Sequence, residues 1–469
     1  MSRGDLALVL MAAGKGTRMR SRLPKVLHPV CGRPILMHAL ELGRELGAKR
    51  RIVVVGSGED EVRAALAAEG YSDVELVRQA EQRGTGHAAL QAKSLLADHP
   101  GPVLVMNGDH PLYRARTFRA LREAFERSGA DLEILVTDMP NPTGYGRVLR
   151  DAGGRVARVV EEVELAETMK RISEVNLGAY LAEASLLFDL LERVRDDNEK
   201  GEFYITDVVE IARQLGKTVD SAKAEDWTES LGINTRLELA RAEGLLRERI
   251  VDKLMLDGVT LEDPEQTYID VDVQIGQDTV IAAGAVIRRG VRIGTGCRID
   301  PGVVIEGSVL GNDVWLKPGC YLEGSRIADR CVLGPNAHLR PGADLGEDVR
   351  LGNFVEVKNS VIGAGTKADH LTYIGDADVG SKVTFGCGSI VVNYDGEKKR
   401  RTTIGDGAFI GCNSNLLAPV VIEAEAYVGA GSTISKTVPS GALGIARAEQ
   451  RNIEGWRKRR FKGGHEHDQ

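Results

Sequence analysis

The second half of this 469-residue chain repeats an aliphatic residue every six positions. A six-residue unit with one inward aliphatic side chain and a nearby Gly, Ala or Asp forms a short strand and a corner, and stacked units bury a continuous aliphatic column. A β-sandwich with regular turns would not keep this register through so many units. The period therefore predicts a solenoid of short stacked strands. The repeated positions are Ile275, Ile281, Ile287, Ile293, Ile299, Ile305, Ile327, Leu333, Leu339, Leu345, Leu351, Val357, Ile404, Ile410, Leu416, Ile422, Val428 and Ile434.

A polar loop breaks this register at residues 391–401, which read VVNYDGEKKRR. Loops that project from a rigid solenoid commonly carry binding groups. We therefore interpret this segment as a functional loop.

The first half of the chain has a different pattern. From Leu6 to about residue 235, short aliphatic runs such as Val103 to Met106 alternate with charged amphipathic segments such as Ala115 to Arg127. This alternation is typical of a largely parallel sheet covered by helices. Ligands of such sheets bind beyond the carboxyl ends of the strands. We therefore expect segment 107–111, NGDHP, to lie at one crevice with the turn that follows the first strand.

That turn is a glycine-rich loop within residues 10–25, LMAAGKGTRMRSRLPK. Gly14 and Gly16 permit positive φ and a close approach of the backbone to a ligand. Bare N–H groups together with fixed positive charge suit a polyphosphate. The loop matches neither a Walker A motif nor a GxGxxG fingerprint. Its cationic side chains are Lys15, Arg18 and Lys25.

A helix is predicted to connect the two halves. Leu239, Leu246, Ile250 and Leu254 recur at helical spacing among charged residues, and Gly258 is a stop signal.

Charge and composition exclude some functions. The net charge of −7 argues against a general nucleic-acid binder, which depends on clustered cations. The basic run from Arg457 to Arg460, with Lys462, is interpreted as a solvated tail. The apolar start, Leu6 to Ala13, is too short to span a membrane, and Arg3 with Asp5 leaves no convincing signal peptide. We therefore expect a cytoplasmic protein.

The six cysteines show no CxxC pairing and no zinc-ligand spacing. We expect them to be small buried thiols in a reducing compartment. They are Cys31, Cys297, Cys320, Cys331, Cys387 and Cys412.

Several motifs together resemble one family. The glycine-rich loop, closed by Pro-Lys, resembles the signature of sugar-1-phosphate nucleotidyltransferases, and the six-residue period resembles the hexapeptide-repeat left-handed parallel β-helix. Nearly the whole chain resembles the bacterial bifunctional N-acetylglucosamine-1-phosphate uridyltransferases and glucosamine-1-phosphate N-acetyltransferases. The further motifs of this resemblance are QAEQRGTGHA, NGDHP, PTGYGR, GEFYITD, LRPGA, GNFVEVK, KADHLTYIGD and VNYDG.

The resemblance implies an α/β nucleotidyltransferase domain with a Rossmann-like mixed sheet, followed by an all-β left-handed parallel β-helix of hexapeptide repeats. The expected boundaries are 1–235 for the uridyltransferase domain, 236–258 for the linker helix, 259–455 for the acetyltransferase β-helix and 456–469 for the basic tail.

For uridylyl transfer, the resemblance implies that the phosphates are held by Gly14, Lys15, Arg18 and Lys25, with Arg18 and Lys25 at the reacting centre. It also implies that Asp109 and Asn234 coordinate Mg²⁺, a hard cation that prefers a few protein oxygens together with water and phosphate. Asn107 stands where Tyr is common in this family. The implied UTP and UDP-sugar contacts are Met11, Ala12, Ala13, Gly14, Lys25, Gln79, Gly84, Thr85, Gly146, Glu161, Asn176 and Asn234.

For acetyl transfer, a sugar ammonium must lose a proton, and an imidazole with an ordinary pKa of about 6.5 suits this task. His370 matches the family's base, whereas His338 has no match. The implied glucosamine-1-phosphate contacts are Arg340, Lys358, Tyr373, Thr384 and Asn393. The implied acetyl-CoA contacts are Cys387, Asn393, Tyr394, Cys412, Ala430 and Arg447.

Three of these positions depart from the common pattern of the family. Thr384 stands where Asn is frequent, Cys387 where Ala is frequent and Cys412 where Ser is frequent. Backbone groups of the two cysteines could still make the expected contacts.

The resemblance thus implies acetyl transfer from acetyl-CoA to glucosamine-1-phosphate, then uridylyl transfer from UTP, which gives UDP-N-acetylglucosamine for cell-wall peptidoglycan. It also implies a homotrimer with acyltransferase sites where subunits meet. One alternative is a single-activity sugar-1-phosphate nucleotidyltransferase whose solenoid is structural or regulatory. Another is a solenoid that acts only as a protein-binding scaffold.

Overall fold

The computed structural model describes residues 4–460, which form two compact units, unit 1 up to Ile250 and unit 2 from Val251. The division falls inside helix α8 (Arg236–Leu256), in the segment where the sequence predicts a connecting helix. None of the described helices is both long and apolar enough to cross a membrane.

Unit 1 contains a nine-stranded mixed sheet, and its main path runs β11-β7-β10-β6-β1-β4-β5. β1 pairs in parallel with β4 and β6, whereas β10 runs antiparallel to β6 and β7. The predicted mixed α/β sheet is therefore confirmed. The strands are β1 (Ala7–Ala12), β4 (Arg50–Val55), β5 (Glu75–Arg78), β6 (Pro102–Asn107), β7 (Leu132–Asp138), β8 (Arg147–Arg150), β9 (Val156–Val160), β10 (Glu174–Glu183) and β11 (Val219–Lys223).

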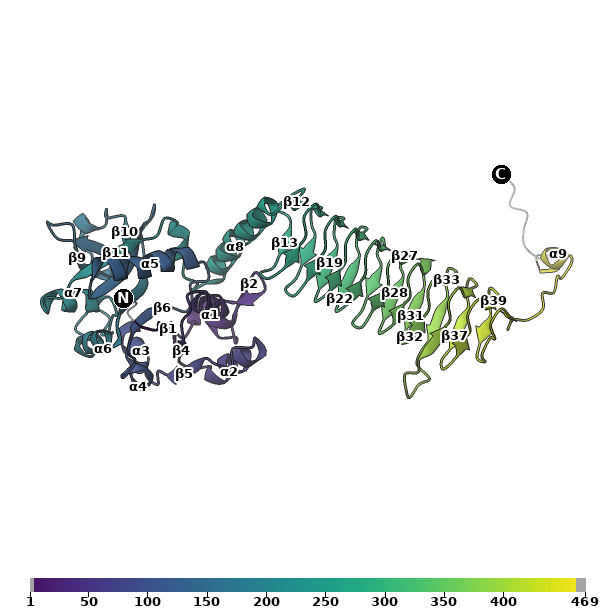
Figure 1. The fold of residues 1–469 in the computed structure, drawn as a ribbon, viewed down its shortest axis with the longest axis horizontal. Coiled ribbons are helices and arrows are strands. Elements are labelled where there is room, and N and C mark those ends of the chain that lie inside the picture. The colour runs from purple at the N-terminus through teal and green to yellow at the C-terminus, as the bar shows by residue number, and fades with distance from the viewer. Residues whose placement is uncertain (1–3, 461–469) are drawn as a thin grey trace. The chain divides into compact units, whose positions relative to one another are not determined.

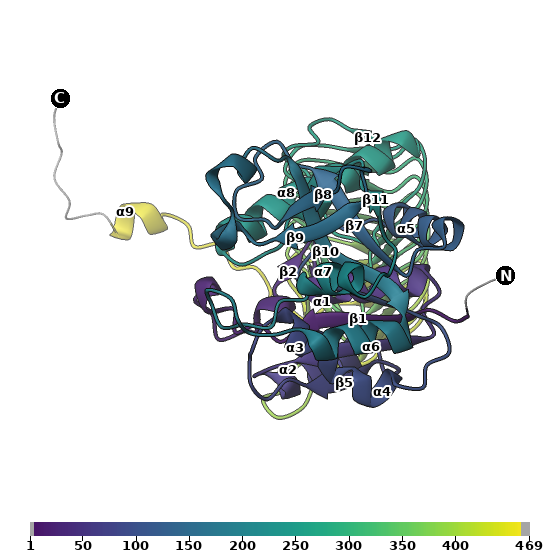
Figure 2. The ribbon, with the colours of Figure 1, turned by 90° about the vertical axis from the view of Figure 1, so that its left-hand side faces the viewer.

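Helices cover both faces of this sheet (Figure 2). Alternate side chains of β1 point to opposite faces, so Leu8 and Leu10 pack with one set of helices and Val9 with the other. The first set is α1 (Ile35–Glu45), α2 (Glu59–Ala68) and α5 (Ala115–Ser128). The second set is α3 (Thr85–Gln91), α6 (Ala184–Arg193) and α7 (Asp207–Gln214). This three-layer arrangement leaves the carboxyl ends of β1 and β6 free to form a site.

Unit 2 is a left-handed β-helix of short parallel strands (Figure 1, green to yellow). Successive coils add strands to three sheets of 11, 10 and 9 strands. The first sheet runs from β12 (Thr260–Leu261) to β41 (Leu443–Gly444) and the second from β13 (Tyr268–Ile269) to β40 (Thr433–Ile434). The third runs from β14 (Gln274–Ile275) to β38 (Val421–Ile422).

The inward aliphatic residues stack from coil to coil. Ile299, Leu316 and Leu333 are register partners in adjacent strands, and all three are fully buried. Burial of such a side chain contributes about 1.5–3 kcal/mol. The column therefore supplies most of the apolar core of a unit whose single coils have no core of their own.

Two details differ from the strict six-residue pattern. Ile275 is only partly buried, because β14 is the first strand of its sheet and no earlier coil covers it. Between Ile305 and Ile327 the inward positions are Leu310, Leu316 and Leu322, which a strict six-residue count does not reach. Corners that are one residue shorter keep these strands in register.

The polar loop leaves the β-helix between β34 (Ile390–Val392) and β35 (Thr402–Ile404) and projects as a hairpin (Figure 1). An isolated antiparallel bridge between Tyr394 and Lys399 closes it. The following coil resumes the parallel register, because Val391 still pairs with Leu416.

The expectation of six buried thiols was wrong for two cysteines. Cys387 is partly exposed and Cys412 is exposed, whereas the other four are buried. Both stand at a corner of the β-helix rather than at an inward position. In the predicted basic tail, the exposed Arg457 and Arg460 lie in the short helix α9 (Trp456–Arg460). Lys462 lies outside the described residues.

Candidate active sites

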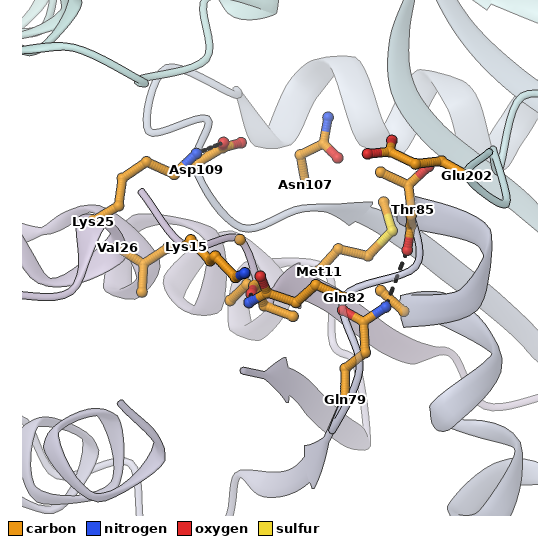
Figure 3. Close-up of a pocket in the computed structure, with 15 residues that line it drawn as sticks. Met11, Lys15, Lys25, Val26, Gln79, Gln82, Thr85, Asn107, Asp109 and Glu202 are labelled. Carbon is orange, nitrogen blue, oxygen red and sulfur yellow. Dashed lines mark hydrogen bonds and ion pairs between the residues drawn. The ribbon is translucent and has the colours of Figure 1, made fainter. Parts of the chain in front are cut away.

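A cavity of about 480 Å³ lies at the carboxyl ends of β1 and β6 (Figure 3). The loop after β1 forms one side, and segment 79–85 forms another. Gly16 has φ +60°, and a Cβ there would lie 2.7 Å from Cβ of Lys25, so this glycine lets the loop close on itself. The residues expected to bind UTP that line this cavity are Met11, Ala12, Ala13, Gly14, Lys25, Gln79, Gly84 and Thr85.

Lys25, Asp109 and Asn234 meet at the edge of this cavity. Lys25 Nζ donates to Asp109 Oδ2 at 2.5 Å and to Asn234 Oδ1 at 3.0 Å. Glu238 Oε2 accepts from the backbone N–H groups of Asn234 and Thr235, which ties Asn234 to the start of α8. Side chains from two distant segments therefore converge on the Lys25 ammonium group.

The electrostatics of Asp109 are dominated by this contact. Burial alone would raise the pKa of Asp109, but the Lys25 ammonium and a hydrogen bond with His110 outweigh it and hold the pKa well below its usual value. Asp109 Oδ1 lies 2.7 Å from Nδ1 of His110. The carboxylate is therefore ionised at neutral pH, and its cationic partner in this structure is the Lys25 ammonium.

A second cavity of about 400 Å³ shares Thr85 and Asn107 with the first. Arg18, Gly146, Glu161, Asn176 and Asn234 line it, so it gathers the remaining residues expected to bind the sugar. The two neighbouring cavities could hold a nucleotide and a sugar phosphate side by side.

The polar groups of the second cavity are held in place. Burial raises the pKa of Glu161, whose Oε1 accepts from Thr206 Oγ1 at 3.1 Å. Asn176 Nδ2 donates to the Tyr180 hydroxyl at 2.6 Å. Gly178 has φ +71°, and a Cβ there would meet the Asn107 amide at 2.3 Å. Gly178 therefore leaves room for the Asn107 side chain at the bulge of β10.

In unit 2, one corner of the β-helix aligns several predicted residues. Each stands two positions after an inward residue of the first sheet, and those inward residues are register partners from coil to coil. The aligned residues are Asn353, His370, Cys387, Cys412 and Ala430. His370 ends β30 (Lys367–His370) and is exposed. The predicted base and three predicted acetyl-CoA contacts therefore follow one edge of the β-helix.

Asn353 orients His370. Asn353 Oδ1 lies 2.7 Å from His370 Nδ1. With the amide oxygen as acceptor, Nδ1 carries the proton and Nε2 keeps its lone pair. In this tautomer Nε2 is the ring nitrogen that can accept a proton. Sequence reasoning missed Asn353, although it lies in the GNFVEVK motif.

The next corner, at the end of the second-sheet strands, carries a cationic cluster. Arg340 and Lys358 each directly follow an inward residue, and Arg340 Nη1 lies 3.0 Å from Glu356 Oε1. The neighbouring Lys399 lowers the pKa of Lys358, and partial burial adds to this effect. Like charges crowded in this way favour the arrival of an anion. Lys399, in the polar loop, was not singled out from the sequence.

Asp376 links this corner to the loop. It accepts from the side-chain amides of Asn359 and Asn393, and its Oδ2 lies 3.9 Å from Lys358 Nζ. Asn393 also lies 3.4 Å from the hydroxyl of Tyr373, in β31 (Tyr373–Gly375). Tyr373 thus stands between the His370 corner and the cationic corner.

The remaining predicted residues of unit 2 are more scattered. Thr384 faces outward in the first sheet, beside Lys367. Tyr394 is exposed on the polar loop. Arg447 is exposed, and its guanidinium donates to the carbonyl of Ala430 at 2.8 Å. Arg447 therefore reaches the same edge as His370 from the last coil.

Sequence reasoning also overlooked some residues that line the cavities of unit 1. Gln82 and Glu202 line the first cavity, and His110 and Tyr145 line the second. All four lie inside the motifs QAEQRGTGHA, GEFYITD, NGDHP and PTGYGR, so membership of those motifs was the available signal.

An α/β sheet with a cationic glycine loop, in one chain with a hexapeptide β-helix, defines a transferase with two catalytic domains. The model of the MobA-like NTP transferase domain matches residues 8–175. The model of the GMPPB C-terminal domain matches residues 264–364, and that of the bacterial transferase hexapeptide (six repeats) matches residues 401–436.

Curated relatives narrow this class to one family. Bifunctional protein GlmU of Listeria welshimeri is 47% identical over 96% of this chain and 98% of its own length. The GlmU proteins of Listeria innocua and Geobacillus sp. are 47% and 46% identical, again over 96% of this chain and over 97% and 96% of their own lengths. The chain belongs to the bifunctional GlmU family. It is a transferase with acetyltransferase and uridyltransferase activities that produce UDP-N-acetylglucosamine, and it uses acetyl-CoA and a divalent metal.

Proposed function

We propose that unit 1 carries out the uridylyl transfer and that unit 2 carries out the acetyl transfer, through the residues assigned below. Acetyl transfer to glucosamine-1-phosphate comes first, and the product then reacts with UTP. The observation that carries this proposal is the convergence of Lys25, Asp109 and Asn234 beside two neighbouring cavities.

In uridylyl transfer, an oxygen of the sugar phosphate attacks the α-phosphorus of UTP, and pyrophosphate leaves. Negative charge grows on the non-bridging and leaving oxygens, so positioned cations supply much of the catalysis. Arg18 and Lys25 take this role, and Lys25 exchanges Asp109 for phosphate when UTP arrives. Gln79, Gly84 and Thr85 hold the uracil. Gly146, Glu161 and Asn176 hold the sugar.

The metal of this reaction is proposed to be Mg²⁺. Asp109 Oδ2 and Asn234 Oδ1 are hard oxygens that already share one cationic atom, Lys25 Nζ, at 2.5 and 3.0 Å. Such a donor pair fits an ion that completes its shell with water and phosphate. When bound, the ion neutralises charge on the phosphates and on the leaving pyrophosphate.

In acetyl transfer, His370 Nε2 takes a proton from the sugar ammonium, and the freed amine attacks the thioester carbonyl. The carbon–sulfur bond then breaks and coenzyme A leaves as the thiol. Arg340 and Lys358 bind the sugar phosphate, while Tyr373, Thr384 and Asn393 bind the sugar. Acetyl-CoA contacts Cys387, Asn393, Tyr394, Cys412, Ala430 and Arg447.

Assembly and location complete the proposal. We propose a homotrimer with acetyltransferase sites completed where subunits meet, because His370 and Tyr394 are exposed on the single chain. We also propose a cytoplasmic location and domain boundaries at 1–235, 236–258, 259–455 and 456–469.

Two assays on one set of variants test whether each unit carries out its own reaction. Acetyl-CoA consumption and pyrophosphate release are measured separately for wild type, His370→Ala and Asp109→Ala. Loss of a general base should lower acetyl transfer about 10²–10⁴-fold. His370→Ala should spare pyrophosphate release, and Asp109→Ala should spare acetyl transfer. A folded variant that loses both signals would contradict the proposal.

A further inference from the structure

Cys387 and Cys412 stand opposite each other on adjacent coils. Their neighbours Phe385 and Ile410 are register partners, and both cysteines lie two residues further along. The carbonyl of Cys387 accepts from the N–H of Asn413 at 2.8 Å, so the two coils stay hydrogen-bonded through this corner. Adjacent parallel strands lie about 4.8 Å apart. Disulfides join residues whose Cα atoms are about 4.4–6.8 Å apart.

The thiol of Cys412 lies against the coil that carries Cys387. A Cβ added to Gly386 would lie 2.9 Å from Cys412 Sγ, so the absence of a side chain there leaves room for this thiol. Formation of the bond requires the two cysteine side chains to turn toward each other across this corner. The general spacing of adjacent coils falls within the Cα range of a disulfide.

These two cysteines are also more exposed to solvent than the other four. Cys412 is exposed and Cys387 partly exposed, whereas Cys31, Cys297, Cys320 and Cys331 are buried. Burial raises the pKa of Cys320 and of Cys331 to about 11, which leaves little thiolate at neutral pH. On the single chain, the corner pair is therefore more accessible to an oxidant in solution than the four buried thiols.

The pair lies beside the proposed acetyl-transfer centre. Cys387 follows His370 along the same edge, one coil later, and the N–H of Gly388 donates to the carbonyl of Leu371 at 3.0 Å. A bond between the cysteines would pull together the two coils on which acetyl-CoA is proposed to lie. Misplacement of reacting groups by about 1 Å can lower a rate a hundredfold.

We propose that Cys387 and Cys412 form a reversible disulfide that switches off acetyl transfer while uridylyl transfer continues. The blocking effect rests on the proposed function of unit 2; the formation of the bond does not. The oxidant is a peroxide. Cys412 sulfur attacks one peroxide oxygen and the O–O bond breaks, which gives a sulfenic acid and the first water. Cys387 sulfur then displaces the hydroxyl, so that the S–S bond forms and the second water leaves with the remaining thiol hydrogen.

Disulfides in a reducing compartment are typically transient and sense the redox state. The switch would stop acetyl-CoA consumption during oxidative stress, and a thiol reductant would restore it.

The test uses the full-length protein, reduced and then treated with hydrogen peroxide. Trypsin cleaves after Lys398, Lys399, Arg400 and Arg401, all of which lie between the two cysteines. A tryptic species that joins both cysteine peptides, two hydrogens lighter than their sum, therefore identifies the bond. Acetyl-CoA consumption should fall about a hundredfold and return with dithiothreitol. Pyrophosphate release should keep its reduced value.

Three variants provide the comparison, each measured against its own reduced form. Cys387→Ala and Cys412→Ser should lose the sensitivity to peroxide. Cys331→Ala, which removes a buried thiol of the same unit, should keep it. Absence of the joined peptides, or joined peptides with undiminished acetyl transfer, would overturn the proposal. A reduced wild type that consumes no acetyl-CoA would instead refute the proposed function of unit 2, while the joined peptides would still test the bond.

Discussion

Lys25 occupies the position where the proposed metal ligands meet, and this makes a specific prediction about metal binding. Lys25 Nζ donates to both Asp109 and Asn234, and the side chains of Lys25 and Asp109 are only 10% and 19% exposed. A divalent cation that enters without nucleotide must displace this ammonium. Lys25→Met removes the competing cation at similar side-chain length, so it should raise the affinity of the free protein for the metal.

The size of the effect follows from the contacts that the metal must break. A hydrogen bond to a charged group contributes about 1.5–3 kcal/mol net. Each 1.4 kcal/mol is a factor of ten in binding, so the loss of one such competitor corresponds to a roughly 10- to 150-fold gain. The pair is largely shielded from water, so salt should weaken it little.

The measurement is a titration with Mn²⁺, a paramagnetic probe that binds oxygen ligands as Mg²⁺ does, followed by electron paramagnetic resonance without nucleotide. Lys15→Met is the matched control. Lys15 lines the same cavity, but among the described residues it is not a partner of Asp109. We expect its Mn²⁺ affinity to stay within about twofold of wild type. The reasoning is refuted if Lys25→Met also stays within that range, about 0.4 kcal/mol.

Three further predictions concern stability and positioning. Glu133 is 1% exposed, and burial raises its pKa to about 7. Between about pH 4.5 and 7 the Glu133 carboxyl therefore stays protonated in the folded state but is ionised in the unfolded state. The free energy of unfolding consequently falls as the pH rises through this range. Glu133→Gln should accordingly stabilise unit 1 by up to roughly 3 kcal/mol at pH 8 and by much less at pH 5, as measured by urea unfolding. An equal gain in stability at both pH values would contradict this prediction. Leu345 is inward and 1% exposed, so Leu345→Ala should lower the free energy of unfolding by about 2–5 kcal/mol. Val361 is 49% exposed, so Val361→Ala should lower it by less than about 0.5 kcal/mol. Similar midpoints of urea unfolding for the two variants would refute the inward column. Asn353→Ala should lower kcat of acetyl transfer about tenfold with little change in KM, because His370 loses the partner that orients it; an unchanged kcat would remove Asn353 from the mechanism.

Much of the fold was predictable because each strand of the β-helix is short and its pattern is local. The six-residue period predicts which residues point inward, and Leu339 and Leu351 are buried as expected. The partial exposure of Ile275 was not predictable from the period, since it depends on whether a neighbouring coil exists. The exposure of Cys412 depends on its place at a corner, which a count of cysteines does not reveal.

Contacts between distant residues were harder to predict. Lys25 is separated from Asp109 by 84 positions of the sequence and from Asn234 by 209, and no rule based on residue spacing predicts contacts at such separations. Segments 107–111 and 14–16 were expected at one crevice because parallel strands end at the same edge, and both line the first cavity. Resemblance suggested Asn234, but the participation of Lys25 as a shared partner emerged only from the structure.

The two proposed phosphate sites share one electrostatic design. Lys25 lies 2.5 Å from Asp109, and Arg340 lies 3.0 Å from Glu356. In each site a carboxylate partly neutralises the cation before the substrate arrives. An arriving phosphate then replaces the carboxylate as the partner of the cation, so less water has to be displaced than from a fully hydrated cation. The carboxylate also holds the ammonium or guanidinium in position before the phosphate binds. A cluster of unpaired cations would attract any anion. A cation that is already paired with a carboxylate binds only an anion that has more charge, or forms better-aligned hydrogen bonds, than that carboxylate. We therefore expect the selectivity of these sites for phosphate to depend on their acidic residues as much as on their basic residues.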